Sequence, residues 1–330
     1  IANDAHGILC EHEELEKGLM EITKKKFDSK LIRDYVLDHF SEDIIANKLI
    51  NNHNFDILHD TFYSKDIYKI KNKKRIITIH DLIHEKYPSY YDTKSIIDLR
   101  KKLFENMDHF ICVSNSTKED LLNYYSIPEE KVKVIYHGSD HLDKILINLK
   151  NKKFEFRKRI IKPFILYVGK RYRYKNFKIL INSFKNSSII NNDFQIVFFG
   201  GEKINKKEAQ MYENLDLRDK IIHLSGDDEV LKYLYQSAKI MVSTSEYEGF
   251  GLNILEALKY NCPVVARDIK VFRELYDNNI FYFKNDESLK YILEETLISN
   301  KIKINSKNEK LALIKKLNWE STSDQMIEVY

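Results

Sequence analysis

One stretch in the second half of the chain, residues 243–258 (STSEYEGFGLNILEAL), constrains the fold more than any other. The compact apolar run before it, residues 238–242, ends in small polar residues and predicts a short buried strand. After it, apolar side chains recur at positions 252, 254, 255 and 258, which is helical spacing. A strand, a turn that contains Gly249 and Gly251, and a helix therefore follow one another in the chain.

The turn between this strand and this helix is suited to binding an anion. Backbone N–H groups at a helix N-terminus have no partner within the helix, and the helix dipole adds about half a positive charge there. Glu248 stands at the mouth of the turn and Glu256 follows in the helix. Carboxylates accept hydrogen bonds from sugar hydroxyls. A phosphate site beside acceptors for hydroxyl groups indicates a nucleotide sugar as the ligand.

The string EGFGLNILEAL, which contains Glu248 and Glu256, resembles the signature of the family-4 retaining glycosyltransferases of the GT-B fold. The resemblance extends from about Phe55 to Tyr330. It implies an α/β protein with two Rossmann-like domains facing across a cleft and a C-terminal helix that crosses back to the first domain. The domains expected on this basis are an N-terminal acceptor domain (residues 1–145), a C-terminal donor domain (146–315) and a closing helix (316–330).

Composition agrees with a globular protein of this size. The chain has 330 residues, of which 43% are hydrophobic and 12% aromatic, so it can bury two cores. Its formal charge of +4 permits attraction to phosphates or to an anionic lipid surface. The basic residues form no long stripe, so we expect no nucleic-acid partner.

Cysteine usage and the absence of a signal peptide suggest a compartment. The three cysteines show no metal-ligand spacing, and Cys112 lies in an apolar run typical of a buried thiol under reducing conditions. No apolar run reaches the roughly 18 residues that span a bilayer. We therefore expect a cytoplasmic protein.

A regular alternation of strands and helices begins at Phe55. The pattern predicts a parallel sheet covered by helices. Ligands of such sheets bind at the carboxyl ends of strands, and this rule selects His80, Asp81, Ser114 and His137. The expected strands of this first half are residues 55–59, 75–80, 109–114 and 132–136.

The block around His80 (IHDLIH) resembles one in the family's first domain, where the equivalent histidine hydrogen-bonds the donor sugar. Asp81 either orients His80 or caps the next helix. Ser114 is expected to cap a helix, and a secondary role at the cleft stays open. The family's first strand leads into a Gly-rich turn that residues 5–7 (AHG) do not reproduce. That turn has either diverged or lies outside the sequence.

A second cationic turn opens the second domain. Residues 141–162 are polar and rich in lysine, as in an inter-domain linker, and residues 164–169 predict a buried strand. Arg171 and Lys175 follow directly. Arginine can hold a phosphate bidentately, whereas lysine supplies a point charge. The string YVGKRYRYKN is similar to the family's diphosphate-binding turn, with Arg171 and Lys175 at its cationic positions.

The resemblance assigns roles to these residues. Glu248 and His80 contact the transferred sugar and are the catalytic candidates, and Glu256 accepts hydrogen bonds from the ribose. The resemblance also implies retention of anomeric configuration, with no metal site and no cofactor. The diphosphate is held by Arg171, Lys175 and the N–H groups of Phe250, Gly251 and Leu252, with Gly169 and Gly249 in the adjoining turns, while Gly226 lies near the base.

The substrates are specified only by class. Several blocks most resemble bacterial mannosyltransferases of surface-polysaccharide assembly, which makes GDP-mannose the first candidate donor and a UDP-sugar the second. The acceptor is a glycan or a lipid-linked saccharide; a lipid-linked one would bring the protein into peripheral contact with the inner membrane face. The alternatives are a GT-B phosphorylase or epimerase and a non-catalytic nucleotide-sugar-binding partner of a glycan-assembly complex.

Overall fold

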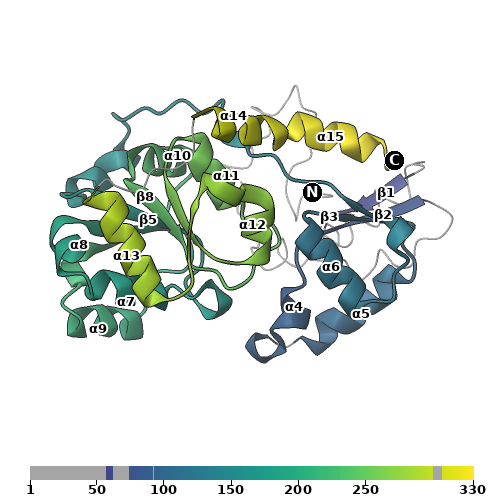
Figure 1. Cartoon of the computed structure of the whole chain (residues 1–330), viewed down its shortest axis with the longest axis horizontal. Helices are drawn as coiled ribbons and strands as arrows, with labels where there is room; N and C mark the ends of the chain where they lie inside the picture. Colours follow the sequence, from purple (N-terminus) through teal and green to yellow (C-terminus); the bar gives the residue numbers. More distant parts are fainter. Residues whose placement is uncertain (1–56, 62–73, 92, 300–306) are drawn as a thin grey trace, which may run out of the picture. The chain divides into compact units, whose positions relative to one another are not determined.

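The computed structural model of the chain describes residues 57–61, 74–91, 93–299 and 307–330 (Figure 1). The sequence also predicts helices at residues 11–23 and 31–50; these two segments and the turn at residues 5–7 lie outside the described part. The described residues fall into two compact units. The smaller unit contains residues 57–61, 74–76 and 99–108, and the larger contains 77–91, 93–98, 109–299 and 307–330.

The smaller unit is held by a buried ion pair. The Arg75 guanidinium donates to the Asp60 carboxylate at 3.0 Å, and both side chains are almost fully enclosed. The backbone N–H of Arg75 donates to the Asp108 carboxylate at 2.7 Å. These polar contacts anchor the beginning of the second strand of the first sheet.

The first sheet has four strands in the order β1-β2-β3-β4. β3 and β4 pair in parallel, with Phe110 opposite Val132. These elements confirm the α/β pattern expected from the sequence. The strands are β1 (Ile57–Asp60), β2 (Lys74–Ile79), β3 (His109–Cys112) and β4 (Val132–Val134), and the helices are α4 (Ile83–Lys86), η3 (Pro88–Tyr90), α5 (Lys94–Phe104), α6 (Asn115–Tyr124) and η4 (Glu129–Lys131).

The second sheet has six strands in the order β10-β9-β8-β5-β6-β7, and every neighbouring pair is parallel. Successive residues of β5 point to opposite faces: Ile165 joins one hydrophobic core and Leu166 the other. The strands are β5 (Phe164–Val168), β6 (Gln195–Phe199), β7 (Ile221–Leu224), β8 (Ile240–Ser243), β9 (Val264–Arg267) and β10 (Phe281–Phe283).

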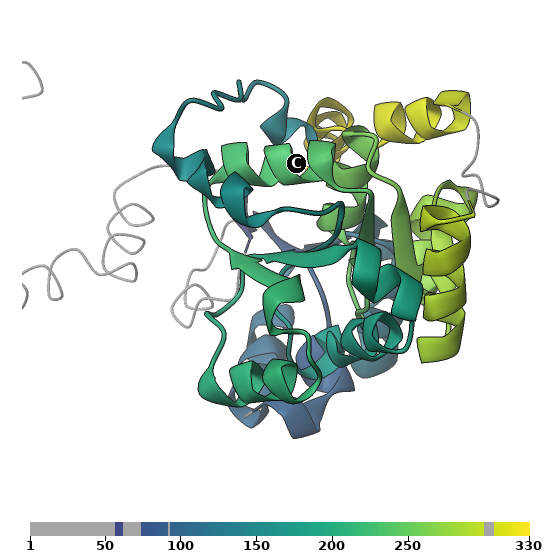
Figure 2. The same cartoon turned by 90° about the vertical axis from the view of Figure 1, so that its left-hand side faces the viewer.

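Helices cover both faces of this sheet (Figure 1, Figure 2). The helices α7, α8, α9 and α13 contribute to one core, and α10, α11 and α12 to the other. This arrangement is a doubly wound, Rossmann-like domain. The helices are η5 (Asp140–Leu142), η6 (Lys152–Arg159), η7 (Arg173–Lys175), α7 (Lys178–Lys185), α8 (Ser188–Asp193), α9 (Lys206–Asn214), η8 (Arg218–Lys220), α10 (Asp228–Ser237), α11 (Leu252–Lys259), α12 (Lys270–Tyr276), η9 (Asp277–Asn279) and α13 (Asp286–Leu297).

The last two helices, α14 (Lys307–Lys316) and α15 (Trp319–Ile327), end the chain. The backbone N–H of Trp319 donates to the Asp140 carboxylate at 2.9 Å, and Thr322 Oγ1 donates to the Tyr136 carbonyl at 2.7 Å. A Cβ at Gly138 would lie 2.2 Å from the Trp319 nitrogen, so only glycine permits this approach. The C-terminal helix therefore returns to the segment that follows β4, as expected.

Candidate functional site

The order of strands in the second sheet creates a switch point, the position at which parallel α/β sheets commonly form a ligand crevice. β5 and β8 are neighbours at its centre. The chain proceeds from β5 outward to β6 and β7, and from β8 outward in the opposite direction to β9 and β10. The loops that leave the carboxyl ends of β5 and β8 therefore diverge and leave a crevice at this switch point. These loops are residues 169–175 and 244–251, the two cationic and Gly-rich turns identified in the sequence.

The two loops are tied to one another by hydrogen bonds. The backbone N–H of Glu246 donates to the Tyr174 carbonyl at 2.7 Å. Thr244 Oγ1 donates to the Lys175 carbonyl at 2.5 Å. At the end of these loops the Lys175 ammonium forms an ion pair with the Glu248 carboxylate. The two residues that the sequence placed in separate halves of the site are thus direct partners.

This ion pair lines a cavity of about 410 Å³. The volume lies within the range of roughly 300–1,000 Å³ that is typical of ligand pockets. His137, which the strand-end rule selected without a role, lies in the same wall, as do Val113, Val168 and Asn253. The predicted site residues that the cavity brings together are His80, Asp81, Gly169, Lys175, Glu248, Gly249, Phe250, Gly251, Leu252 and Glu256.

The glycine turn passes directly against the backbone of His80. A Cβ at Gly249 would lie 1.7 Å from the His80 carbonyl oxygen, so no other residue fits. Gly251 has a φ of 87° and is the N-cap of α11, without a side-chain cap. Gly251, Leu252 and Asn253 line the cavity, and no side chain caps this helix end, which suits it to an anion.

Glu256 is buried in α11 and is held in place from both sides. Tyr235 Oη donates to Oε2 of Glu256 at 2.7 Å, and His141 Nε2 lies 3.4 Å from Oε1. Burial raises the pKa of this carboxyl, and the tyrosine hydrogen bond and the charge of His141 oppose that rise. Neither Tyr235 nor His141 was singled out in the sequence, because each lies far from Glu256 along the chain.

The two histidines of the cavity stack on one another. The ring centroids of His80 and His137 are 5.5 Å apart, and His137 also contacts the rings of Phe250 and Trp319. Burial and, to a smaller extent, the neighbouring His80 together lower the pKa of His137 to about 4. His137 is therefore neutral at physiological pH and presents an uncharged ring to the wall.

Ser114 is the N-cap of α6, whereas Asp81 precedes Leu82, the N-cap of α4. Asp81 accepts from the backbone N–H of Ile83 at 3.1 Å, and Ser114 accepts from that of Thr117 at 3.0 Å. The Ser114 hydroxyl also donates to the Gly249 carbonyl at 2.7 Å, so it supports the glycine turn from behind. Asp81 lines the cavity, whereas Ser114 does not. Gly226 is not a lining residue either, and it directly precedes Asp227, the N-cap of α10.

Arg171 differs from Lys175 because protein atoms already hold it. Its Nε and Nη2 donate to the Glu208 carboxylate at 2.9 and 3.1 Å, and Nη2 also donates to the Glu202 carbonyl at 2.7 Å. The guanidinium lies over the Phe198 ring and does not line the cavity. The structure thus gives Arg171 a bidentate carboxylate partner, and its contact with a diphosphate stays a prediction.

Comparison with known proteins agrees with this architecture. Residues 22–141 match the model for "Glycosyltransferase Family 4" and residues 150–311 the model for "Glycosyl transferases group 1". The chain belongs to the family-4 glycosyltransferases of the GT-B fold. Over 219 residues it is 30% identical to the O-antigen chain mannosyltransferase RfbU of Salmonella typhimurium, and the match covers 65% of this chain and 58% of RfbU. It thus spans less than two thirds of that curated relative.

Solved structures share the fold. The sucrose-phosphate synthase of Thermosynechococcus elongatus superposes with a TM-score of 0.70 at 18% identity, covering 90% of this chain and 79% of the synthase. Anabaena Alr3699/HepE, solved with UDP-glucose, superposes with a TM-score of 0.71 at 17% identity, covering 87% of this chain and 81% of HepE. In the part of the chain that the structure describes, no helix combines the length and apolar character needed to cross a membrane.

Proposed function

We propose that this chain transfers a hexose from a nucleotide diphosphate sugar to a glycan or lipid-linked acceptor, with mannose as the first candidate. The observation that carries the proposal is the cavity at the switch point, where Lys175, Glu248 and the free end of α11 meet. A cation and a helix N-terminus bind phosphate, and buried or half-buried carboxylates bind sugar hydroxyls. The family relationship supports the same class of reaction.

In the proposed donor complex, Lys175 and the α11 N–H groups hold the diphosphate, while Glu256 accepts from the ribose. Lys175 then exchanges its carboxylate partner for a phosphate oxygen. This exchange leaves the Glu248 carboxylate available to the hydroxyls of the transferred hexose, opposite His80. Donor binding and release of Glu248 are therefore coupled through one ion pair.

The chemical problem of the reaction is charge on the leaving group. Cleavage of the anomeric C–O bond increases the negative charge on the diphosphate and leaves a cationic sugar ring. Donors fixed where charge develops lower such a barrier, and loss of one typically costs about 2.7–4 kcal/mol. In our proposal Lys175 and the α11 dipole supply this stabilisation without a metal ion. The acceptor attacks from the face that the leaving group departs from, so configuration is retained.

The similarity to a mannosyltransferase supports GDP-mannose as the first donor to test. UDP-sugars come second, because HepE was solved with UDP-glucose. We place the protein in the cytoplasm, with peripheral contact at the inner membrane face if the acceptor is lipid-linked. The net positive charge supports that contact.

The first experiment measures thermal stabilisation by GDP, UDP, ADP, CMP and their common sugar conjugates. A ligand that binds only the folded state adds about 2.7 kcal/mol at a hundredfold excess over its dissociation constant. We expect one nucleotide family to stabilise the protein, and Glu256→Gln to weaken its binding about tenfold because a charged acceptor for the ribose is lost. Glu287→Gln, an exposed glutamate in α13, is the matched control. Failure of every nucleotide to bind would refute the proposal.

Stereochemistry gives a second, independent test. With the donor class known, NMR of the product reports the configuration of the new glycosidic bond. We expect the anomeric configuration of the donor to be kept. An inverted product would exclude the retaining mechanism while leaving glycosyl transfer intact.

A further inference from the structure

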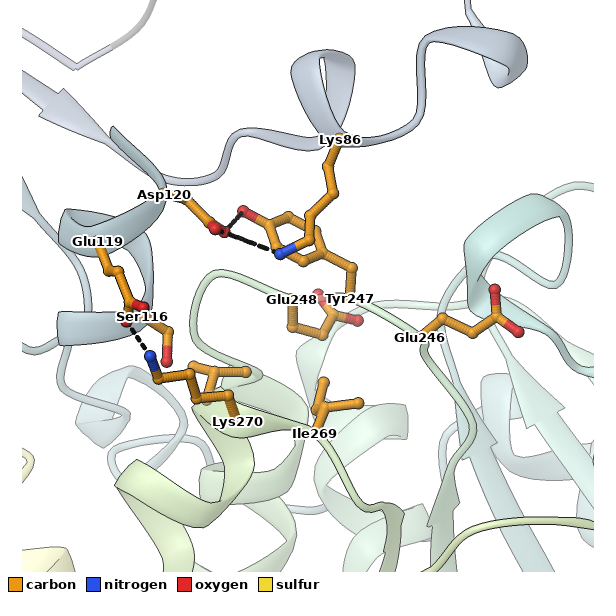
Figure 3. Close-up of a pocket in the computed structure, with 10 residues that line it drawn as sticks. Lys86, Ser116, Glu119, Asp120, Glu246, Tyr247, Glu248, Ile269 and Lys270 are labelled. Atoms are coloured by element: carbon orange, nitrogen blue, oxygen red, sulfur yellow. Dashed lines mark hydrogen bonds and ion pairs between the residues drawn. The ribbon is translucent and has the colours of Figure 1, made fainter. Parts of the chain in front are cut away.

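A second cavity, of about 310 Å³, is lined in part by the loop that follows β8 (Figure 3). Glu248 belongs to the walls of both cavities. Residues before it, Glu246 and Tyr247, line the second cavity, and residues after it, from Gly249 onward, line the first. A sugar held at Glu248 in the first cavity is therefore adjacent to whatever occupies the second.

The opposite wall of the second cavity comes from α4 and α6, and its floor from the start of α12. Lys86 of α4 and Asp120 of α6 form an ion pair at 3.2 Å. The Tyr247 hydroxyl donates to the same Asp120 carboxylate at 2.8 Å, and the Lys86 ammonium lies over the tyrosine ring. Figure 3 shows this cluster on one side of the cavity and the ion pair between Lys270 and Glu119 on the other.

The charges around this cavity oppose a phosphorylated ligand. Its lining includes four carboxylates, from Glu119, Asp120, Glu246 and Glu248, but only two ammonium groups, from Lys86 and Lys270. Both ammonium groups are already paired with carboxylates. The other two carboxylates, Glu246 and Glu248, pair with Arg267 and Lys175, so every charge of this lining has a partner and no ammonium group is left for a phosphate.

The N-terminus of α6 does not change this conclusion. Its first N–H groups are occupied by side chains: those of Asn115 and Ser116 donate to the Glu274 carboxylate at 2.6 and 2.9 Å, and that of Thr117 donates to Ser114. This helix end therefore has little left to offer a phosphate. The cavity favours a neutral ligand that is rich in hydroxyl groups.

We propose that the second cavity binds the acceptor as a neutral pyranose, with its hydroxyls on Asp120, Glu246 and Lys86. Carboxylates accept hydrogen bonds from sugar hydroxyls, and an ammonium group donates hydrogen bonds to them. The assignment rests on the proposed function, since it takes its meaning from the donor at Glu248.

The test uses the full chain saturated with the nucleotide that stabilises it. Methyl glycosides of mannose, glucose, galactose, N-acetylglucosamine and N-acetylgalactosamine are the probes, with saturation-transfer NMR as the readout. Ile269→Trp fills the cavity from its floor, and Asp120→Asn removes one charge without changing shape. Ile189→Trp on α8, 50% exposed and in neither cavity wall, is the matched control.

We expect at least one glycoside to bind the wild type and Ile189→Trp equally, and to bind Ile269→Trp and Asp120→Asn at least tenfold more weakly. Nucleotide stabilisation should be the same in all four proteins. Equal glycoside binding by all four, or no glycoside binding by the wild type with nucleotide bound, overturns the assignment and leaves the proposed function standing. If no nucleotide binds the wild type, the proposed function fails and the acceptor assignment falls with it.

Discussion

Two cation–carboxylate pairs originate from the same loop, four residues apart, and they differ in their surroundings. In the pair of Arg171 with Glu208, the side chains are 1% and 10% exposed. In the pair of Lys175 with Glu248, they are 22% and 17% exposed and line the first cavity. The first pair is closed and bidentate, and the second is open at one side to a ligand.

The difference shows that the number of cations in a turn does not by itself make the turn a phosphate site. A guanidinium that is enclosed between an aromatic ring and a bidentate carboxylate has already lost its water and gained its partner. A phosphate would have to displace that carboxylate and leave it buried. Lys175 has a partner at the edge of the cavity, so a phosphate can replace it at lower cost.

The largest expected effect comes from the open pair. We expect Glu248→Gln to lower the rate of sugar transfer by about 100- to 1,000-fold, the typical cost of losing one group that stabilises a transition state. Stability should change by less than about 1 kcal/mol, because the pair is partly exposed. Initial rates of nucleotide diphosphate release give the measurement. Glu213→Gln, in the exposed pair with Arg218, is the control, and near-wild-type turnover of Glu248→Gln would contradict the assignment.

Loss of the closed pair, Arg171 with Glu208, should lower the stability of the folded protein. Arg171→Ala removes one partner of a buried pair and leaves the Glu208 carboxylate without it, which we expect to lower the free energy of unfolding by about 3 kcal/mol. Urea unfolding measures the loss, and the double variant with Glu208→Ala should regain part of it. The sequence-based interpretation expects weaker nucleotide binding by Arg171→Ala as well. If Arg171→Ala keeps its stability but loses nucleotide binding, the Arg171 guanidinium contacts the nucleotide and does not mainly stabilise the fold.

Lys175→Met should affect nucleotide binding more than stability, the opposite of what we expect for Arg171→Ala. We expect its affinity for the stabilising nucleotide to fall about tenfold, since one charge-assisted contact to the diphosphate is lost. Its unfolding free energy should stay within about 1 kcal/mol of the wild type. Isothermal titration and urea unfolding give the two numbers, with Lys178→Met on the exposed face of α7 as the control. A stability loss as large as that of Arg171→Ala would erase the distinction between the pairs.

Acid should weaken the closed pair. Burial by itself would raise the pKa of Glu208, but hydrogen bonds from Arg171, Tyr172 and the Asn205 N–H outweigh it and lower the pKa below its usual 4.5. A carboxyl group whose pKa is lower in the folded state than in the unfolded state stabilises the fold at pH values above its unfolded-state pKa. This contribution to stability is lost as the pH falls through the folded-state pKa. The stability advantage of wild type over Glu208→Gln should therefore shrink below about pH 4.5. A difference that does not depend on pH would contradict this.

Much of the fold follows from local patterns. The strands expected at residues 164–169 and 238–242 appear as β5 and β8, and the helix expected at 252–260 appears as α11. Apolar runs of strand length and helical spacing depend only on neighbouring residues, so they are readable in one dimension. The helices α9 and α13 were not predicted, although each begins with a capping box, at Asn205 and Asn285. An asparagine at the N-cap is a local signal for the start of a helix.

The contacts between residues of the site could not be predicted from local sequence patterns. The bond from Ser114 to the Gly249 carbonyl joins residues 135 positions apart, and that from Tyr235 to Glu256 crosses between two helices. The exclusion of any Cβ at Gly249 depends on where the His80 carbonyl lies. Such contacts depend on how the elements dock, which local spacing does not encode.

The sequence by itself determined the α/β class, the order of the elements and the two turns that carry the candidate site. Residue type and spacing suffice for these, because they reflect burial and hydrogen bonding within one element. The tertiary structure decided which cation of the turn at residues 169–175 lines the cavity, since Arg171 is enclosed with Glu208 while Lys175 pairs with Glu248 at the cavity wall. It also decided that Glu248 stands between two cavities, because a shared wall exists only once distant segments have packed together.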